Sequence, residues 1–316
     1  MKVKFWGVSG SIASPCTSQM IRSKAETLLL DASNEDIKDE DSIQKFLDSR
    51  PFHQVGTYKG STSCVQVIPD SGDTLIFDCG TGGRALGLAL MGTPLGRGQG
   101  TAHVFFTHLH WDHISGFPFF TPAYIPGNKI NIYGVSESLI ESFPKQMAYP
   151  FFPVLFDQLG ADVSFRELEE KEVVNIGELV IENERLYHPQ VSHAYSVVEG
   201  DKKVVYMTDS EFNFANMELI QKAIEFCKDA DVFIFDCQFT FADTISKMDW
   251  GHSSVFTGID IATAAGVKKL VLFHHEPSYD DNKIDKIIEE GLIYKGKVGN
   301  ESLEIVGGYE GLELEC

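Results

Sequence analysis

The sequence lacks long apolar segments, closely spaced cysteine pairs and a segment typical of a signal peptide. Its longest apolar runs, such as Val232 to Phe235, are far shorter than the roughly 20 residues that a membrane-spanning helix needs. The six cysteines form no C-x-x-C pair, so neither a zinc ribbon nor a redox motif is indicated. These absences predict a soluble, cytoplasmic protein with reduced thiols and no membrane partner.

Basic residues are scarce relative to acidic ones. The 26 Lys and Arg residues against 46 Asp and Glu residues give a formal net charge of −20 at pH 7. A surface of this sign repels polyanions over long distances, because like charges must be brought together. Extended binding to nucleic acid is therefore not expected, and a small substrate is favoured.

What the sequence does contain is a set of short, β-rich apolar runs that each end in an acidic residue or a histidine. With 316 residues and 43% hydrophobic residues, the chain can bury a large core. In α/β folds, ligands bind outside the carboxyl ends of strands, so residues at these run ends are expected to share one site. The five run-end residues are Asp78, His108, Asp209, Asp236 and His274.

Helix patterns lie between several of these runs. Apolar residues recur at helical spacing over 220–227 and again over 284–288, and a third helix is expected after His252. Asn216 and either Asp280 or Asp281 are expected N-caps. Strands that alternate with helices predict an α/β architecture. Residues 16–55 are rich in acidic side chains and read as a helical insertion at the surface.

The strongest local motif places three histidines and an aspartate within six residues, directly after a predicted strand. In an extended segment His108 and His110 point to one side, while Asp112 and His113 can face a second position at the following turn. This arrangement suits two metal ions. Two ions about 3.5 to 4 Å apart can each bind a substrate oxygen and share a hydroxide, since they lower the pKa of water.

This motif resembles the H-x-H-x-D-H motif of the metallo-β-lactamase-fold hydrolases. The segments 4–12, 60–65 and 111–120 are similar to the branch that contains ribonuclease Z, phosphoribosyl cyclic phosphate phosphodiesterases and cyclic nucleotide phosphodiesterases. The resemblance implies an αββα four-layer sandwich, in which two packed mixed β-sheets are flanked by helices. Residues 1–316 are accordingly expected to form one domain with the insertion at about 16–55.

The resemblance also implies roles for individual residues. One metal ion would be bound by His108, His110 and His188, and Asp209 would bridge to the second ion. The second ion would be bound by Asp112, His113 and His274, with Asp78 orienting the histidines from behind. His275 competes with His274 for the ligand role, and otherwise becomes an outer contact or a contact to phosphate. Tyr195 is expected to line the pocket, whereas His193 receives no role.

A second pair, Asp236 and His252, resembles the acidic residue and histidine of ribonuclease Z. A carboxylate on one ring nitrogen raises the basicity of the imidazole, and the other nitrogen can then protonate a departing oxygen. Asp112, Asp236 and His252 are thus the expected catalytic residues, with Asp112 positioning or deprotonating the water.

The leading hypothesis is a dinuclear metal-dependent phosphodiesterase that hydrolyses a small cyclic phosphate, foremost a 3′,5′-cyclic nucleotide, by metal-bound hydroxide. Zinc is favoured by the imidazole-rich ligands, and manganese or iron would also suit the mixed carboxylates. The alternatives are a ribonuclease Z-like endonuclease, a thioester or lactone hydrolase on the same fold, and a metal-containing ligand sensor without turnover. A homodimer is expected because the relatives that the chain resembles dimerise.

Overall fold

The computed structural model describes residues 1–212 and 217–316, and these form two seven-stranded sheets. The first sheet has the order β14-β1-β2-β3-β4-β5-β6. Their bounds are β1 (Lys2–Gly7), β2 (Cys64–Ile68), β3 (Thr74–Phe77), β4 (Thr101–Phe106), β5 (Lys129–Gly134), β6 (Asp162–Glu167) and β14 (Glu313–Glu315). Pairing is antiparallel from β14 to β3 and parallel from β3 to β6, so the sheet is mixed.

The second sheet has the order β13-β12-β11-β10-β9-β8-β7. Its strands are β7 (Val173–Ile176), β8 (Leu179–Leu186), β9 (Ser192–Glu199), β10 (Lys202–Met207), β11 (Val232–Asp236), β12 (Lys269–Phe273) and β13 (Glu304–Gly307). Strands β7 to β10 pair antiparallel, whereas β10 to β13 pair in parallel. All five residues of β11 are buried, as expected for a parallel strand that is covered on both faces.

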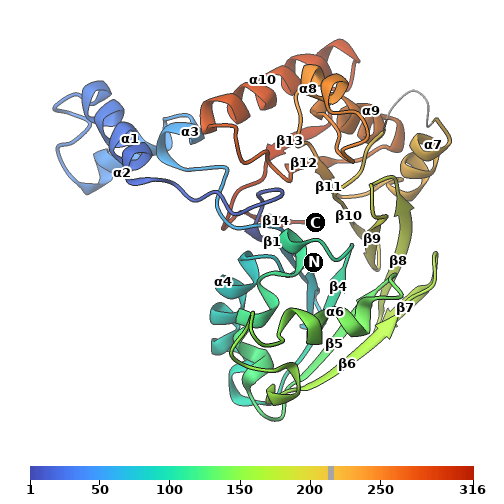
Figure 1. Ribbon diagram of the computed structural model, residues 1–316. Coiled ribbons are helices and arrows are strands. Elements are labelled where there is room, and N and C mark those ends of the chain that lie inside the picture. Colours follow the sequence, from blue (N-terminus) through green and yellow to red (C-terminus); the bar gives the residue numbers. More distant parts are fainter. Residues whose placement is uncertain (213–216) are drawn as a thin grey trace.

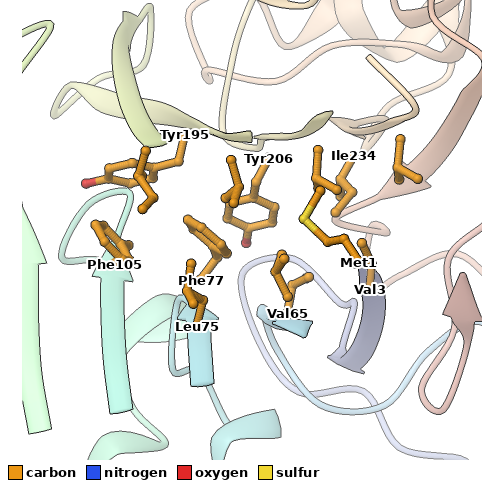
Figure 2. Packing of buried hydrophobic residues seen from close by; sticks show 14 of the residues in the cluster. Met1, Val3, Val65, Leu75, Phe77, Phe105, Tyr195, Tyr206 and Ile234 are labelled. Atoms are coloured by element: carbon orange, nitrogen blue, oxygen red, sulfur yellow. The ribbon is translucent and has the colours of Figure 1, made fainter. Parts of the chain in front are cut away.

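The main core lies between the two sheets. Figure 2 shows Tyr195 and Tyr206 of the second sheet facing Phe77 and Phe105 of the first. The ring centroids of Phe77 and Tyr206 are 5.8 Å apart, and those of Phe105 and Tyr195 are 5.4 Å apart, which are favourable separations for aromatic pairs. These contacts pack the sheets face to face.

Helices cover the outer faces of both sheets. Apolar residues of α4 and α6 join the cluster on the outer side of the first sheet, and those of α7, α9 and α10 join the cluster on the second. The bounds are α4 (Gly82–Ala89), α5 (Trp111–Ile114), α6 (Leu139–Gln146), α7 (Met217–Phe226), α8 (Phe241–Ser246), α9 (Val255–Ala265) and α10 (Asp281–Lys297). Five 3₁₀ turns complete the described elements: η1 (Leu90–Gly92), η2 (Pro94–Arg97), η3 (Phe117–Phe119), η4 (Thr121–Tyr124) and η5 (Phe156–Gln158). The predicted four-layer αββα sandwich is confirmed.

The three helices predicted outside the insertion are all present. Helix α9 follows His252 as expected, and Asp280 caps α10 by accepting a hydrogen bond from the backbone N–H of Lys283. The expected N-cap Asn216 lies outside the described residues. Among the helices that the structure describes, none has the length and apolar character needed to cross a membrane.

The segment between β1 and β2 forms α1 (Ser18–Asp31), α2 (Glu40–Asp48) and α3 (Phe52–Val55). Figure 1 shows α1 and α2 standing away from the two sheets. Helix α1 buries none of its residues, and α2 buries only Phe46. Thr17 caps α1, and Asp39 with Ser42 forms a capping box on α2, so local hydrogen bonds define where both helices begin.

Candidate metal centre

The polar residues at five strand ends converge on one place. Asp78 and His274 directly follow a strand and Asp209 comes two residues after one, and all three share a left-handed backbone, with φ of 55°, 62° and 54° in that order. A residue in this region cannot continue a strand, so each strand ends there and the chain turns. Such a backbone is costly for a residue other than glycine and is typical of functional sites.

One cluster consists of His108, His110 and His188, whose candidate ligand atoms lie within 4.8 Å of one another. His110 Nδ1 and His188 Nε2 are 3.3 Å apart, and His188 Nδ1 donates a hydrogen bond to the carbonyl of Gly251 at 3.1 Å. Burial lowers the pKa of both His108 and His188 below the usual range, which favours the neutral imidazole that a metal ion requires.

The second cluster consists of Asp112, His113, Asp209 and His274, all of them buried. His113 Nε2 lies 3.1 Å from Asp209 Oδ2, and His274 Nε2 lies 3.2 Å from Asp112 Oδ2. Burial lowers the pKa of His274, but the carboxylates of Asp209 and Asp112 outweigh this effect and raise it to about 9. Negative charge is therefore concentrated where a cation would bind.

Asp209 connects the two clusters. Its Oδ2 belongs to the second cluster, while its Oδ1 lies 3.8 Å from His108 Nε2 and 3.9 Å from His188 Nε2 in the first. A carboxylate with one oxygen toward each cluster is suited to bridge two ions. The structure thus places Asp209 between the two clusters, and the bridging role expected for it stays a prediction.

The residues present fit a pair of divalent metal ions. His108 Nε2 is buried and, among the described residues, has no hydrogen-bond partner, although a buried polar atom is costly when unpaired. Imidazole nitrogens and carboxylate oxygens are the donors that zinc, manganese and iron accept. A metal ion between the ring nitrogens of the first cluster would satisfy this atom.

Asp78 lies behind the second cluster and is fully buried. Its Oδ2 accepts hydrogen bonds from His113 Nδ1 at 2.8 Å and from the hydroxyl of Tyr206 at 2.9 Å. The backbone N–H of Thr107 donates to Oδ1 at 2.9 Å. Asp78 therefore fixes the ring of His113 with Nε2 toward the second cluster.

Asp236 and His252 form a hydrogen-bonded pair beside both clusters. His252 Nδ1 donates to Asp236 Oδ2 at 2.8 Å, and the carboxylate also accepts the backbone N–H groups of Ser210 and Gln238, each at 3.1 Å. The His252 ring centroid is 5.1 Å from that of His274. The pair predicted from the sequence is thus brought together at the site.

Two expected positions differ in the structure. His275 points away from the clusters, because the chain turns at His274, and its Nε2 donates to the carbonyl of Gly308 at 2.8 Å. The expected contact of His275 with phosphate or with the ligands is therefore wrong, and His274 takes the place in the cluster. Tyr195 does not line the pocket: it is fully buried between the sheets, with its hydroxyl on the carbonyl of Phe106 at 2.8 Å.

A cavity of about 330 Å³ opens onto the clusters and includes residues that the sequence analysis did not single out. Ser11 is one of them, and its backbone N–H donates to Asp112 Oδ2 at 2.8 Å. Trp111 lies between two residues of the histidine motif, so its position in the sequence could have identified it as a residue of the cavity. Trp250 has no such neighbour in the sequence, and only folding brings it to the cavity. The lining comprises Ser11, His110, Trp111, Asp112, His188, Pro189, Asp209, Trp250, His252 and His274.

Comparison with known proteins identifies the family. Residues 73–275 match the model of the beta-lactamase superfamily domain, which covers more than half of the chain. The chain belongs to the beta-lactamase superfamily. The family predicted from the histidine motif is therefore confirmed, and with it the expected class of metal-dependent hydrolase. Superfamily proteins of this fold generally bind two divalent metal ions, in agreement with the two clusters.

Several known proteins are similar to this chain over most of their length. A ribonuclease Z of Geobacillus kaustophilus is 23% identical over 276 residues, covering 73% of this chain and 87% of that protein. The metallo-beta-lactamase fold protein YhfI of Bacillus subtilis is 20% identical with a TM-score of 0.65, covering 100% of this chain and 99% of that one. Zinc-bound PqqB of Methylobacterium extorquens is 15% identical with a TM-score of 0.64 and covers both chains completely.

Proposed function

We propose that this superfamily member is a dinuclear metal-dependent phosphodiesterase that hydrolyses a small cyclic phosphate, foremost a 3′,5′-cyclic nucleotide. The observation that carries the proposal is the Asp236–His252 pair, which is hydrogen-bonded at 2.8 Å and whose histidine lines the cavity that opens onto both clusters. Phosphodiester hydrolysis requires a proton for the departing oxygen, and this pair is built to hold one.

In this proposal His108, His110 and His188 bind one ion, while Asp112, His113 and His274 bind the other, with Asp209 between them. When bound, the ions supply positive charge for the phosphate oxygens and lower the pKa of water. Zinc is the favoured ion because imidazoles predominate, and manganese and iron are the other candidates. The bound zinc of the related PqqB supports this choice.

Two side chains of the cavity would act in proton transfer: Asp112 on the attacking water and His252 on the departing oxygen. Ser11 holds Asp112 through its backbone N–H, so one carboxylate oxygen is fixed where the attacking water is to be positioned and deprotonated. On the other side, Asp236 occupies Nδ1 of His252, which leaves Nε2 as the atom that faces the cavity and protonates the departing oxygen. The acid and the base are thus held by different elements.

The size and charge of the protein favour a small substrate. A cavity of about 330 Å³ lies at the lower end of the range for small-molecule sites, which is about 300 to 1,000 Å³. The net charge of −20 opposes the approach of a long polyanion. Both features favour a cyclic mononucleotide over a folded RNA.

The second candidate is a ribonuclease Z-like endonuclease. It is favoured by one observation, namely that curated relatives named ribonuclease Z align over 73% and 74% of this chain. No comparable observation favours thioester or lactone hydrolysis, or ligand sensing without turnover. We propose further that the protein is a homodimer, which light scattering at micromolar concentration tests directly.

Phosphorus NMR tests the proposed function. Protein reconstituted with zinc, and separately with manganese, is incubated with 3′,5′-cyclic nucleotides, a generic phosphodiester and a precursor tRNA. Ring opening of the cyclic nucleotides is the expected result, and the resulting monophosphate identifies which P–O bond breaks. Cleavage of the tRNA alone would favour the endonuclease, and no reaction in any sample would contradict both candidates.

A further inference from the structure

We propose that Trp111 and Trp250 form a subsite that stacks on the base of a nucleotide substrate without selecting which base it is. The inference rests on the proposed phosphodiesterase function and deepens it, because it assigns the part of the substrate that does not react. Both indoles line the cavity that opens onto the metal clusters, and they are 66% and 60% exposed.

Packing does not account for these two indoles. The third tryptophan, Trp6, is partly buried and donates its indole N–H to Gln66 at 3.1 Å. In the described part of the chain neither Trp111 nor Trp250 has a hydrogen-bond partner for its indole N–H. Large apolar side chains that share the rim of one cavity indicate a binding surface, since exposure of this kind contributes nothing to the core.

Each indole is held at a defined place relative to the metal clusters. Trp111 begins α5 and lies between His110 and Asp112, so its backbone is fixed by two candidate ligands. Trp250 precedes Gly251, whose carbonyl accepts the hydrogen bond of His188 Nδ1 at 3.1 Å.

The loop that carries Trp250 has two further attachments. The Tyr187 hydroxyl donates to Asp249 Oδ1 at 3.0 Å, and the Trp250 backbone N–H donates to the Lys247 carbonyl at 3.2 Å. The Lys247 ammonium lies 5.5 Å from the Trp250 ring centroid, within the range of a cation–π contact. The subsite is therefore positioned before a substrate arrives.

The chemistry of indole determines what such a subsite can recognise. Every nucleobase has a π-face that stacks on an aromatic ring, so stacking tolerates all bases. An indole has one hydrogen-bond donor and no acceptor, and therefore cannot distinguish the donor and acceptor patterns of base edges. The expected substrate class is nucleotides of any base, with KM values for adenine and cytosine cyclic nucleotides within about tenfold.

Steady-state kinetics with two matched substrates tests the subsite. The zinc-loaded enzyme and its Trp111→Leu, Trp250→Leu and double variants are compared on 3′,5′-cyclic AMP and on the cyclic phosphate of 1,3-propanediol, which has the same six-membered ring but no base. For cyclic AMP each single substitution is expected to raise KM about tenfold while kcat changes less than about threefold. KM for the propanediol ester is expected to stay unchanged. Trp111→Phe and Trp250→Phe should restore most of the affinity.

Phe151→Leu serves as the matched control, because Phe151 is an 81% exposed aromatic residue that does not line the cavity. Equal KM changes for both substrates, or no change for cyclic AMP, would overturn the inference. If the wild type hydrolyses neither substrate, the proposed function fails, and the subsite is then tested by isothermal titration calorimetry with AMP. Binding of AMP that is lost in the double variant supports the subsite, whereas binding that persists in it refutes the subsite.

Discussion

His252 Nδ1 lies 2.8 Å from Asp236 Oδ2, and this contact joins the end of β11 to the segment that enters α9. Asp236 is fully buried and also accepts two backbone N–H groups, so its carboxylate cannot rotate away from the histidine. The imidazole is thereby held in one orientation beside the two clusters of candidate metal ligands.

Replacing His252 by alanine is expected to lower kcat about 10² to 10⁴-fold, because the departing oxygen loses its proton donor. Metal content, measured by elemental analysis, should stay at two ions per chain, since the two clusters do not require His252. Asp236→Asn should show a smaller loss of the same kind. An unchanged kcat in His252→Ala with intact metal content rules out this role.

Gly251→Ala is expected to weaken metal binding at least about tenfold. A Cβ at this position would meet His188 Nδ1 at 2.0 Å, so the ring of a candidate ligand must move. Its backbone φ of +88° also strains any residue other than glycine. Titration of the metal-free protein with zinc measures the effect.

Gly72→Ala is the matched control for Gly251. Its φ is +85°, but a Cβ there would meet nothing within 4 Å. The two variants thus share the backbone strain and differ in the contacts of the new Cβ with His188 and with Pro189. If both bind zinc with the affinity of the wild type, the displacement of His188 does not occur.

Asp78→Asn is expected to lower metal affinity about 10- to 100-fold, since His113 loses the charged acceptor that orients it. Asparagine tolerates the left-handed backbone of this position, so the fold should be retained. Competition with a chelator of known affinity measures the loss. Tyr206→Phe removes only the neighbouring hydroxyl and should have a smaller effect; equal effects would contradict the orienting role of the charge.

The buried side chain of His193 is expected to lower the free energy of unfolding in acid. It is buried on β9 and neither ring nitrogen has a partner among the described residues, and burial lowers its pKa to about 4. An unfolded histidine has a pKa of about 6.5, so between these values the unfolded chain binds a proton that the native state excludes. The free energy of unfolding therefore falls as the pH drops from about 6.5 toward 4.

At pH 5 this difference amounts to about 2 kcal/mol for His193 alone. His193→Gln removes the titrating group, so the metal-free variant should lose about 2 kcal/mol less than the wild type between pH 7.5 and pH 5. Urea unfolding at the two pH values measures this. Parallel losses in the two proteins would show that His193 does not control the acid response.

Local patterns in the sequence predict much of this molecule. The apolar runs before Asp78, Asp209 and His274 became strands β3, β10 and β12, because an almost continuous apolar run is stable only where both faces of a strand are covered. The histidine motif identifies the family from six consecutive residues, since its ligands are neighbours in the chain.

Only the tertiary structure decides which face of each strand meets the cavity. His274 and His275 are adjacent and chemically identical, yet one joins the cluster and the other bonds to Gly308, because the chain turns at His274 with a φ of 62°. Tyr195 lies on β9 with its ring in the core between the two sheets, which its position in the sequence did not predict. Gly251 packs against His188, and Trp111 and Trp250 line the same cavity. Both arrangements join residues that are far apart in the chain. The sequence by itself determined the strands, the fold family and the metal-binding motif, since these depend on near neighbours. The packing of two sheets decided which distant residues complete the site, because that depends on contacts that no local pattern encodes.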